Sequence, residues 1–190
     1  PLFDDQSMWV RMAMLDHWSR ASAAEPYVRE RLYDDEVIVR RRAAHALAAA
    51  PERRTSNFDR LLTCIDDADG FMQSGTIHYL KDDERARTRI REVLRRYLTW
   101  SMNFARDEAL GALVDDPESR PLIRQFLEED KTYYSHAFSR LAANAEWRPL
   151  LRNRLNRADP EPDVVKAFAG DVDAKTRIRE LLHHQDGHLR

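Results

Sequence analysis

Apolar anchor residues recur along the chain at nearly constant intervals, and this recurrence is the strongest limit on its fold. One series, with steps of 27 to 33 residues, consists of Leu15, Leu47, Leu80, Leu110, Leu141 and Phe168. A second series lies between the members of the first, again with steps of 27 to 33 residues, and consists of Leu32, Ile65, Leu94, Leu127, Leu155 and Leu182. Two interleaved series at a fixed period indicate a repeat protein whose units each contribute two elements.

The elements of each unit are expected to be helices. The 190 residues include only five glycines, and apolar residues are spaced three and four apart, which favours helices over strands. We therefore predict an all-α fold: a right-handed α-solenoid of stacked antiparallel helix pairs with about eleven helices and no sheet. The longer helices are predicted at 6–19, 37–50, 68–80, 100–114, 131–144 and 161–169, and the shorter ones at 27–32, 58–65, 89–98, 121–127, 149–155 and 177–182.

Prolines and acidic residues mark the ends of these helices. Pro51 is expected to stop the helix that carries Leu47, whereas Pro26, Pro121 and Pro149 fall in the first turns of shorter helices, where a missing N–H costs nothing. Acidic turns separate the two helices of a pair at Asp34-Asp35, Asp66-Asp67, Glu129-Asp130 and Asp159, whereas the Arg95–Thr99 junction departs from this pattern. We expect these carboxylates to cap helix N-termini rather than to bind metal or act as catalytic acids.

The stretch Asp34–Glu52, DDEVIVRRRAAHALAAAPE, shows the unit most clearly. An acidic turn, a Val-Arg pair and a run of small residues that ends in Leu47 resemble the HEAT repeat, and the resemblance covers nearly the whole chain. It implies a single HEAT-like array over 1–190. In that family an Asp-to-Arg pair links neighbouring repeats, and Asp34 or Asp35 with Arg40 or Arg41 matches it here.

Both ends of the chain resemble interrupted repeats. Asp4-Asp5 has the pattern of a turn between two helices, and Leu189-Arg190 has the position at which another long helix would begin. We therefore expect a segment of a longer array, with apolar faces exposed near Met8–Leu15 and Ile178–Leu182.

The resemblance also implies which residues face a partner, because the longer helices of the family line its concave surface. Positions two and five residues before each anchor share one side of a helix. The polar residues expected to form a partner-binding groove are Arg42, His45, His78, Glu108, His136 and Ser139. His45 and His78 occupy equivalent places and could approach each other, but two ligands without a third do not predict a metal site.

No spacing of residues predicts catalysis or a cofactor. Nucleophile elbows, phosphate-binding glycine loops, H-E-x-x-H and C-x-x-C are all absent from the sequence. The single cysteine, Cys64, allows no internal disulfide, and no apolar run approaches the ~20 residues of a membrane span. We expect a cytoplasmic, non-enzymatic chain without metal, cofactor or membrane partner.

Charge gives little support for a nucleic-acid partner. The net charge is -2, although arginines concentrate at 85–96 and at 148–157. We interpret both concentrations as solvated, ion-paired faces on the shorter helices. The aromatic residues are expected mainly to pack between repeats, and they include Trp9, Trp18, Tyr79, Trp100, Tyr133, Tyr134 and Trp147.

The function that fits best is a protein-interaction scaffold or ligand-sensing segment of a larger bacterial protein. The Arg-rich texture of units such as RPLLRNRLNRADPEP resembles C-terminal sensor regions of signalling NTPases of the NACHT/STAND type, which implies an NTPase domain elsewhere in the parent protein. The partner would be a protein or another part of the same polypeptide. Two alternatives remain: a DNA-binding module similar to HEAT-like alkylpurine DNA glycosylases, and an enzyme similar to phycobilin lyases.

Overall fold

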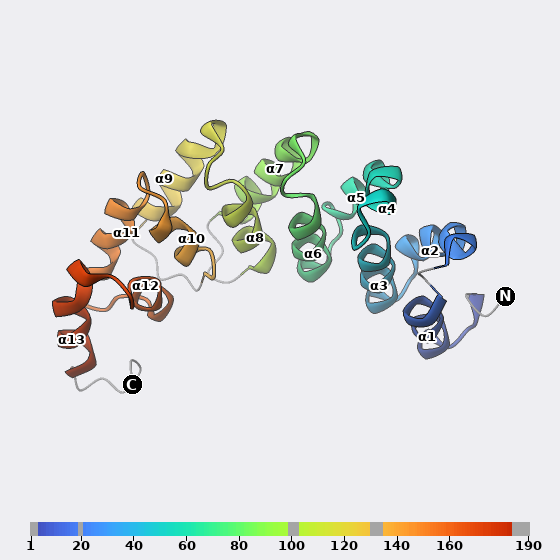
Figure 1. The fold of residues 1–190 in the computed structure, drawn as a ribbon, viewed down its shortest axis with the longest axis horizontal. Helices are drawn as coiled ribbons and strands as arrows, with labels where there is room; N and C mark the ends of the chain where they lie inside the picture. Colours follow the sequence, from blue (N-terminus) through green and yellow to red (C-terminus); the bar gives the residue numbers. More distant parts are fainter. Residues whose placement is uncertain (1–3, 19–20, 99–102, 130–134, 184–190) are drawn as a thin grey trace. The chain divides into compact units, whose positions relative to one another are not determined.

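The computed structural model describes residues 4–18, 21–98, 103–129 and 135–183. Within these ranges all regular structure is helical, with thirteen α-helices, several short 3-10 turns and no strand, so the all-α prediction is confirmed (Figure 1). The helix count exceeds the predicted total of about eleven; each of the twelve ranges predicted above overlaps a described helix, and the one without a prediction is α4 (Pro51–Ser56). Pro51 both ends one helix and begins α4. None of the described helices is long and apolar enough to cross a bilayer.

The chain divides into two compact units, 1–93 and 94–190, and each is described by itself. In unit 1, three longer helices lie side by side, with α3 between α1 and α6, and the shorter α2 and α5 pack against them from one side (Figure 1). The helices of unit 1 are α1 (Met8–Trp18), α2 (Glu25–Glu30), α3 (Val37–Ala48), α4, α5 (Phe58–Cys64) and α6 (Gly70–Leu80).

In unit 2, α10 packs against α11 and α12, and α11 packs against α9 and α12. The boundary between the units falls within α7 (Arg87–Tyr97). The remaining helices are α8 (Phe104–Ala112), α9 (Arg120–Glu128), α10 (Phe138–Ala143), α11 (Arg148–Leu155), α12 (Pro162–Ala167) and α13 (Lys175–His183).

Helix positions agree with the predictions, but several boundaries do not. The helix predicted at 131–144 is described only as α10, and residues 130–134 and 99–102 lie outside the described ranges. Pro26, Pro121 and Pro149 all fall in the first turn of their helices, as expected.

The core contains nearly all of the predicted anchors. All six anchors of the first series are buried, and so are five of the second series, from Leu32 to Leu155. The exception is Leu182, which is 48% exposed, because its neighbour Leu181 takes the buried position on α13. The period of 27 to 33 residues therefore predicted burial correctly at every anchor except the last.

Close packing of the long helices in unit 1 depends on small residues. In α3 the buried positions Ala43, Ala44 and Ala48 accompany Val39 and Leu47 at three- and four-residue spacing. Alanine side chains let neighbouring helices approach closely, while Leu47 fills the space between them. Burying one such leucine contributes about 1.5–3 kcal/mol.

Arginine and aspartate side chains link the starts of successive long helices. Arg11 of α1 makes two hydrogen bonds of 2.8 Å to Asp34, in the turn before α3. Arg40 of α3 bonds in the same way to Asp67, in the turn before α6, at 2.9 and 3.2 Å. Burial alone would raise the pKa of the Asp34 carboxyl, but the hydrogen bonds from Arg11 and from the Glu36 backbone hold that pKa below its usual value.

The family-based pairing of Asp34 or Asp35 with Arg40 or Arg41 is therefore right in kind and wrong in partner. Arg40 reaches Asp34 and Asp35 through their backbone carbonyls, at 2.9 and 3.1 Å, while its carboxylate partner is Asp67. The acidic turns also cap differently from the prediction, since Asp69, rather than Asp66 or Asp67, accepts from the Met72 N–H at the start of α6.

Candidate interaction surface

Three of the six predicted groove residues lie on one exposed face of unit 1. Arg42 and His45 are on α3, and His78 is on α6; all three are exposed, as predicted. The other three belong to unit 2, where Glu108 on α8 is half-buried and His136 and Ser139, just before and within α10, are exposed.

Arg42 is paired with Asp16 of α1 at 3.0 Å, with both side chains about half exposed. An exposed ion pair of this kind contributes about 0.2–1 kcal/mol, so it can exchange for a partner's charges at small cost. The pair places one positive and one negative group on the same face, where α1 and α3 are neighbours.

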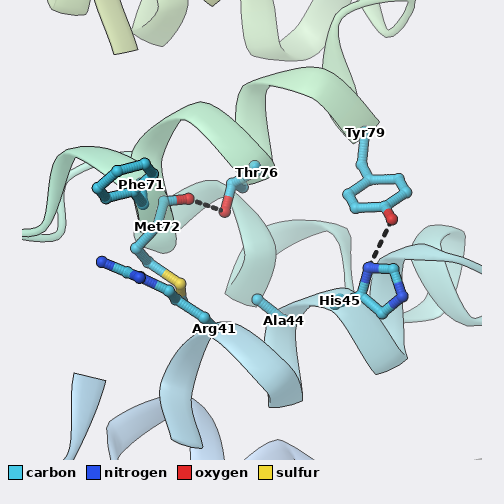
Figure 2. A pocket seen from close by; sticks show the side chains of 8 residues that line it. Arg41, Ala44, His45, Phe71, Met72, Thr76 and Tyr79 are labelled. Carbon is cyan, nitrogen blue, oxygen red and sulfur yellow. Dashed lines mark hydrogen bonds between the residues drawn. The ribbon is translucent and has the colours of Figure 1, made fainter. Parts of the chain in front are cut away.

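Tyr79 contacts both histidines. A hydrogen bond of 2.6 Å links Tyr79 Oη and His45 Nδ1 (Figure 2). The rings of His45 and His78 each meet the Tyr79 ring edge to face. Among the described residues there is no group of three or more His, Cys, Asp or Glu side chains placed to hold a metal ion.

A hollow of about 100 Å³ opens between α3 and α6 beside this hydrogen bond. Its wall from α3 consists of Arg41, Ala44 and His45, and its wall from α6 consists of Phe71, Met72, Gly75, Thr76 and Tyr79 (Figure 2). The Arg41 guanidinium lies 4.7 Å from the centre of the Phe71 ring and is held by two hydrogen bonds to Asp69, at 2.7 and 2.6 Å. Arg41 is therefore fixed in position as part of the wall.

Gly75 keeps this hollow open. A Cβ atom at position 75 would meet nothing within 4 Å, so the space above the glycine is empty of the protein's own side chains. Gly75 lines the hollow, and its lack of a side chain leaves this space unfilled.

A second, wider hollow of about 710 Å³ lies between the C-terminal halves of α1 and α3. Arg42 and His45 line it together with Asp16 and Leu15, and the α2 and α4 side contributes Glu25 and Arg53. His45 thus borders both hollows, which makes one continuous uneven surface across α1, α3 and α6.

Sequence reasoning missed three exposed apolar residues on the same helices: Trp9, Ile38 and Phe71. The expectation that aromatic residues mainly pack between repeats is wrong for Trp9, which is exposed, and right for Trp147, which is buried. The helical period could have found two of them, because Ile38 lies four residues before Arg42 and Phe71 lies seven residues before His78, spacings that keep residues on one side of a helix.

The arginine-rich stretches are largely ion-paired, as expected. Arg85 pairs with Asp83 at 2.7 Å, and Arg89 with Glu92 at 3.0 Å. In unit 2, Arg148 and Arg152 share Asp171, at 2.5 and 3.0 Å.

Two arginines of unit 2 are not at the surface at all. Arg154 is buried with Glu161, and its guanidinium also donates to the Glu129 carbonyl at 3.0 Å. Arg106 is buried beside Asp107, whose pKa is raised by burial although the Arg106 charge opposes that rise. These groups hold unit 2 together and are not accessible to a polyanion.

Comparison with protein-family models, with curated protein sequences and with solved structures finds no match to the chain in any of the three.

Proposed function

We propose that the chain is a non-catalytic protein-interaction module that binds a protein partner through the exposed face of its long helices. The observation that carries the proposal is the surface over α1, α3 and α6, where Arg42 and His45 line hollows that the protein's own side chains leave open. His78 is exposed on α6 and contacts Tyr79, which lines the smaller hollow. In unit 2 the corresponding groups are Glu108, His136 and Ser139.

We also propose the finer architecture, in which HEAT-like helix pairs stack as a right-handed α-solenoid over 1–190. It is supported by the periodic buried anchors and by the repeated link from Arg11 to Asp34 and from Arg40 to Asp67. A solenoid offers a long surface rather than a single reactive site, which suits recognition of a protein. The resemblance to sensor regions of NACHT/STAND-type NTPases and the cytoplasmic location stay predictions from the sequence.

A protein partner fits the charges of this surface better than a nucleic acid does. The face carries positive and negative charge, with Arg42 beside Asp16. In the 85–96 stretch, Arg85 and Arg89 are already paired with carboxylates. Nucleic-acid binding requires several basic groups that can neutralise phosphates, and its affinity falls steeply with salt.

Site-specific photo-crosslinking in the protein's own cells tests the proposal. A photoreactive phenylalanine derivative replaces His45 or His78 on the long-helix face, or Arg60 and Thr88 as exposed controls elsewhere in unit 1. We expect one protein to be captured from positions 45 and 78 and not from 60 and 88, and Arg42→Glu to weaken the capture while Arg60→Glu does not.

Equal capture from all four positions would contradict the proposal. So would tight binding of duplex DNA at physiological salt with an affinity that falls steeply as salt rises, which would favour the DNA-binding alternative.

A further inference from the structure

Three large apolar side chains are exposed at the same place on successive long helices of unit 1. Trp9, Ile38 and Phe71 are each the second residue of their helix, α1, α3 and α6, and they are 67%, 39% and 52% exposed. Surface side chains of this size usually occur singly, so three at equivalent positions form a feature that requires an explanation. We refer to Trp9, Ile38 and Phe71 as the apolar row.

The three helices are in register, so the row is continuous. Two residues after each member stand Arg11, Arg40 and Gln73, and each of these donates a hydrogen bond to backbone carbonyls of the turn before its own helix. These equivalent hydrogen bonds give the three helix starts the same local structure, and the Arg11–Asp34 and Arg40–Asp67 bonds join each start to the next in the same way.

The helices are also parallel neighbours over their length. The links from Arg11 to Asp34 and from Arg40 to Asp67 join their starts, while the bonds from Arg42 to Asp16 and from Tyr79 to His45 join positions further along. Packed helices lie about 8–10 Å apart, so the row spans roughly 16–20 Å.

The hollow beside Phe71 provides a place for one anchoring side chain. Phe71 forms its rim, and Ala44 and Met72 give it an apolar floor (Figure 2). Its volume of about 100 Å³ lies well below the roughly 300–1,000 Å³ of small-molecule sites. The hollow suits the end of an aliphatic side chain that belongs to a larger partner.

The turns that precede the three helices make the rim beside the row acidic. Two clefts along these turns are lined by eight carboxylates and only three guanidinium groups. Asp35, Glu36 and Asp66 are exposed among them, and Glu36 lies two residues before Ile38. A partner that lies on the row therefore meets negative charge along one flank, which favours basic side chains there and disfavours nucleic acid and anionic lipid.

We propose that the apolar row binds a basic amphipathic helix of a protein partner. Its apolar stripe covers Trp9, Ile38 and Phe71, one of its aliphatic side chains enters the hollow beside Phe71, and Lys or Arg residues on its flank face Asp35, Glu36 and Asp66. A helix rises about 10.5 Å in seven residues, so apolar residues at i, i+7 and i+14 match the spacing of the three helices. This inference rests on the proposed function and names the chemistry of the partner.

The test uses the full chain and three synthetic peptides of about 18 residues, long enough to cover the row. The first peptide carries a Leu stripe flanked by Lys. The second keeps the stripe and replaces Lys by Glu, and the third has the composition of the first with Leu distributed around the helix. Fluorescence anisotropy should show binding of the first peptide, with the other two at least about ten-fold weaker.

Variants locate the binding on the protein. Trp9→Ser with Phe71→Ser should weaken the first peptide about ten-fold or more. Gly75→Gln, which fills the hollow without meeting another group at its Cβ, should weaken it without lowering the melting temperature. Val172→Ser removes a more exposed apolar side chain, 84% exposed in unit 2, and should change nothing.

Each contrary outcome overturns a stated part of the inference. Equal binding of the third peptide, or no effect of the Trp9 and Phe71 substitutions, would show that the row is not the site. Stronger binding of the acidic peptide would contradict the inference that the partner is basic. Binding of the chain to phosphatidylcholine vesicles through Trp9 would show that the row binds lipid rather than a protein helix. All of these outcomes leave the photo-crosslinking test of the proposed function intact, because that test reads capture at positions 45 and 78.

Discussion

The short and long helices of unit 1 expose two different surfaces. On the short-helix side, arginines are numerous but paired: Arg85 bonds to Asp83 and stacks on Phe58 at 3.7 Å, and Arg89 pairs with Glu92. On the long-helix side, Trp9, Ile38 and Phe71 are exposed and a hollow stands open beside Gly75. The proposed interface therefore rests on exposed apolar area beside an open hollow rather than on charge density.

Both surfaces depend on one core, so the largest effect is expected from the core itself. Leu47→Ala should lower the free energy of unfolding by about 2–5 kcal/mol, because it leaves a cavity where α3 packs. Denaturant unfolding measures this loss, and Leu182→Ala, at the exposed anchor position, serves as the control with a smaller loss. A cost at Leu47 below ~1 kcal/mol would mean that the site collapses without a cavity.

The second largest loss of stability is expected when an Arg–Asp link between helix starts is removed. Asp34→Asn leaves the buried Arg11 guanidinium without its charge partner and should cost about 3 kcal/mol at neutral pH. The pKa of Asp34 is lower in the folded chain than its unfolded value of about 3.9, so the stabilisation is present above about pH 4 and is lost as the pH falls through the folded pKa.

Stability measured from pH 7 to pH 2 checks this prediction. The Asp34→Asn protein should lose less stability below pH 4 than the parent chain does, whereas Asp35→Asn, at an exposed neighbour, should follow the parent curve. Parallel acid curves for the parent and Asp34→Asn would show that the link to Arg11 carries no pH-dependent stability.

A smaller effect on stability is expected when glycines within helices are replaced by alanine, and it should differ between Gly75 and Gly111. Gly75→Ala should stabilise the chain by about 0.5–1 kcal/mol, because alanine is the better helix former and its Cβ meets nothing. Gly111→Ala should stabilise the chain less or destabilise it, because its Cβ would come within 3.1 Å of Arg140 Nη1. Thermal unfolding of the two variants measures this difference. An equal rise in melting temperature for both would contradict the claim that only position 75 has room for a Cβ atom.

The smallest effect is expected at the exposed ion pair. Arg42→Ala should change stability by less than about 1 kcal/mol, as both Arg42 and Asp16 are about half exposed. A much larger loss in chemical denaturation would make Arg42 a structural residue and remove it from the interaction surface.

The sequence predicted the parts of this fold that follow from periodic burial. Leu47, Leu80 and Leu110 are buried because large apolar residues at a fixed period must face the core of a helical repeat. The same period placed Arg42, His45 and His78 correctly on the exposed side of their helices.

Features set by partners from distant parts of the chain could not be predicted in this way. Arg154 belongs to a basic cluster in the sequence, yet it is buried because Glu161 and the Glu129 carbonyl converge on it in space. The sequence also predicted that Trp9 packs in the core, because an aromatic residue at helical spacing is usually buried, but Trp9 is exposed.

Hydroxyl-radical footprinting with the Leu/Lys peptide tests most directly whether the long-helix face of unit 1 is the interface. Oxidation of Trp9 and Phe71 should fall when the peptide is bound, while Tyr27 on the short-helix side, which is also exposed, should oxidise at an unchanged rate. Protection of Tyr27 with Trp9 and Phe71 left reactive would place the interface on the other side of unit 1 and contradict the account.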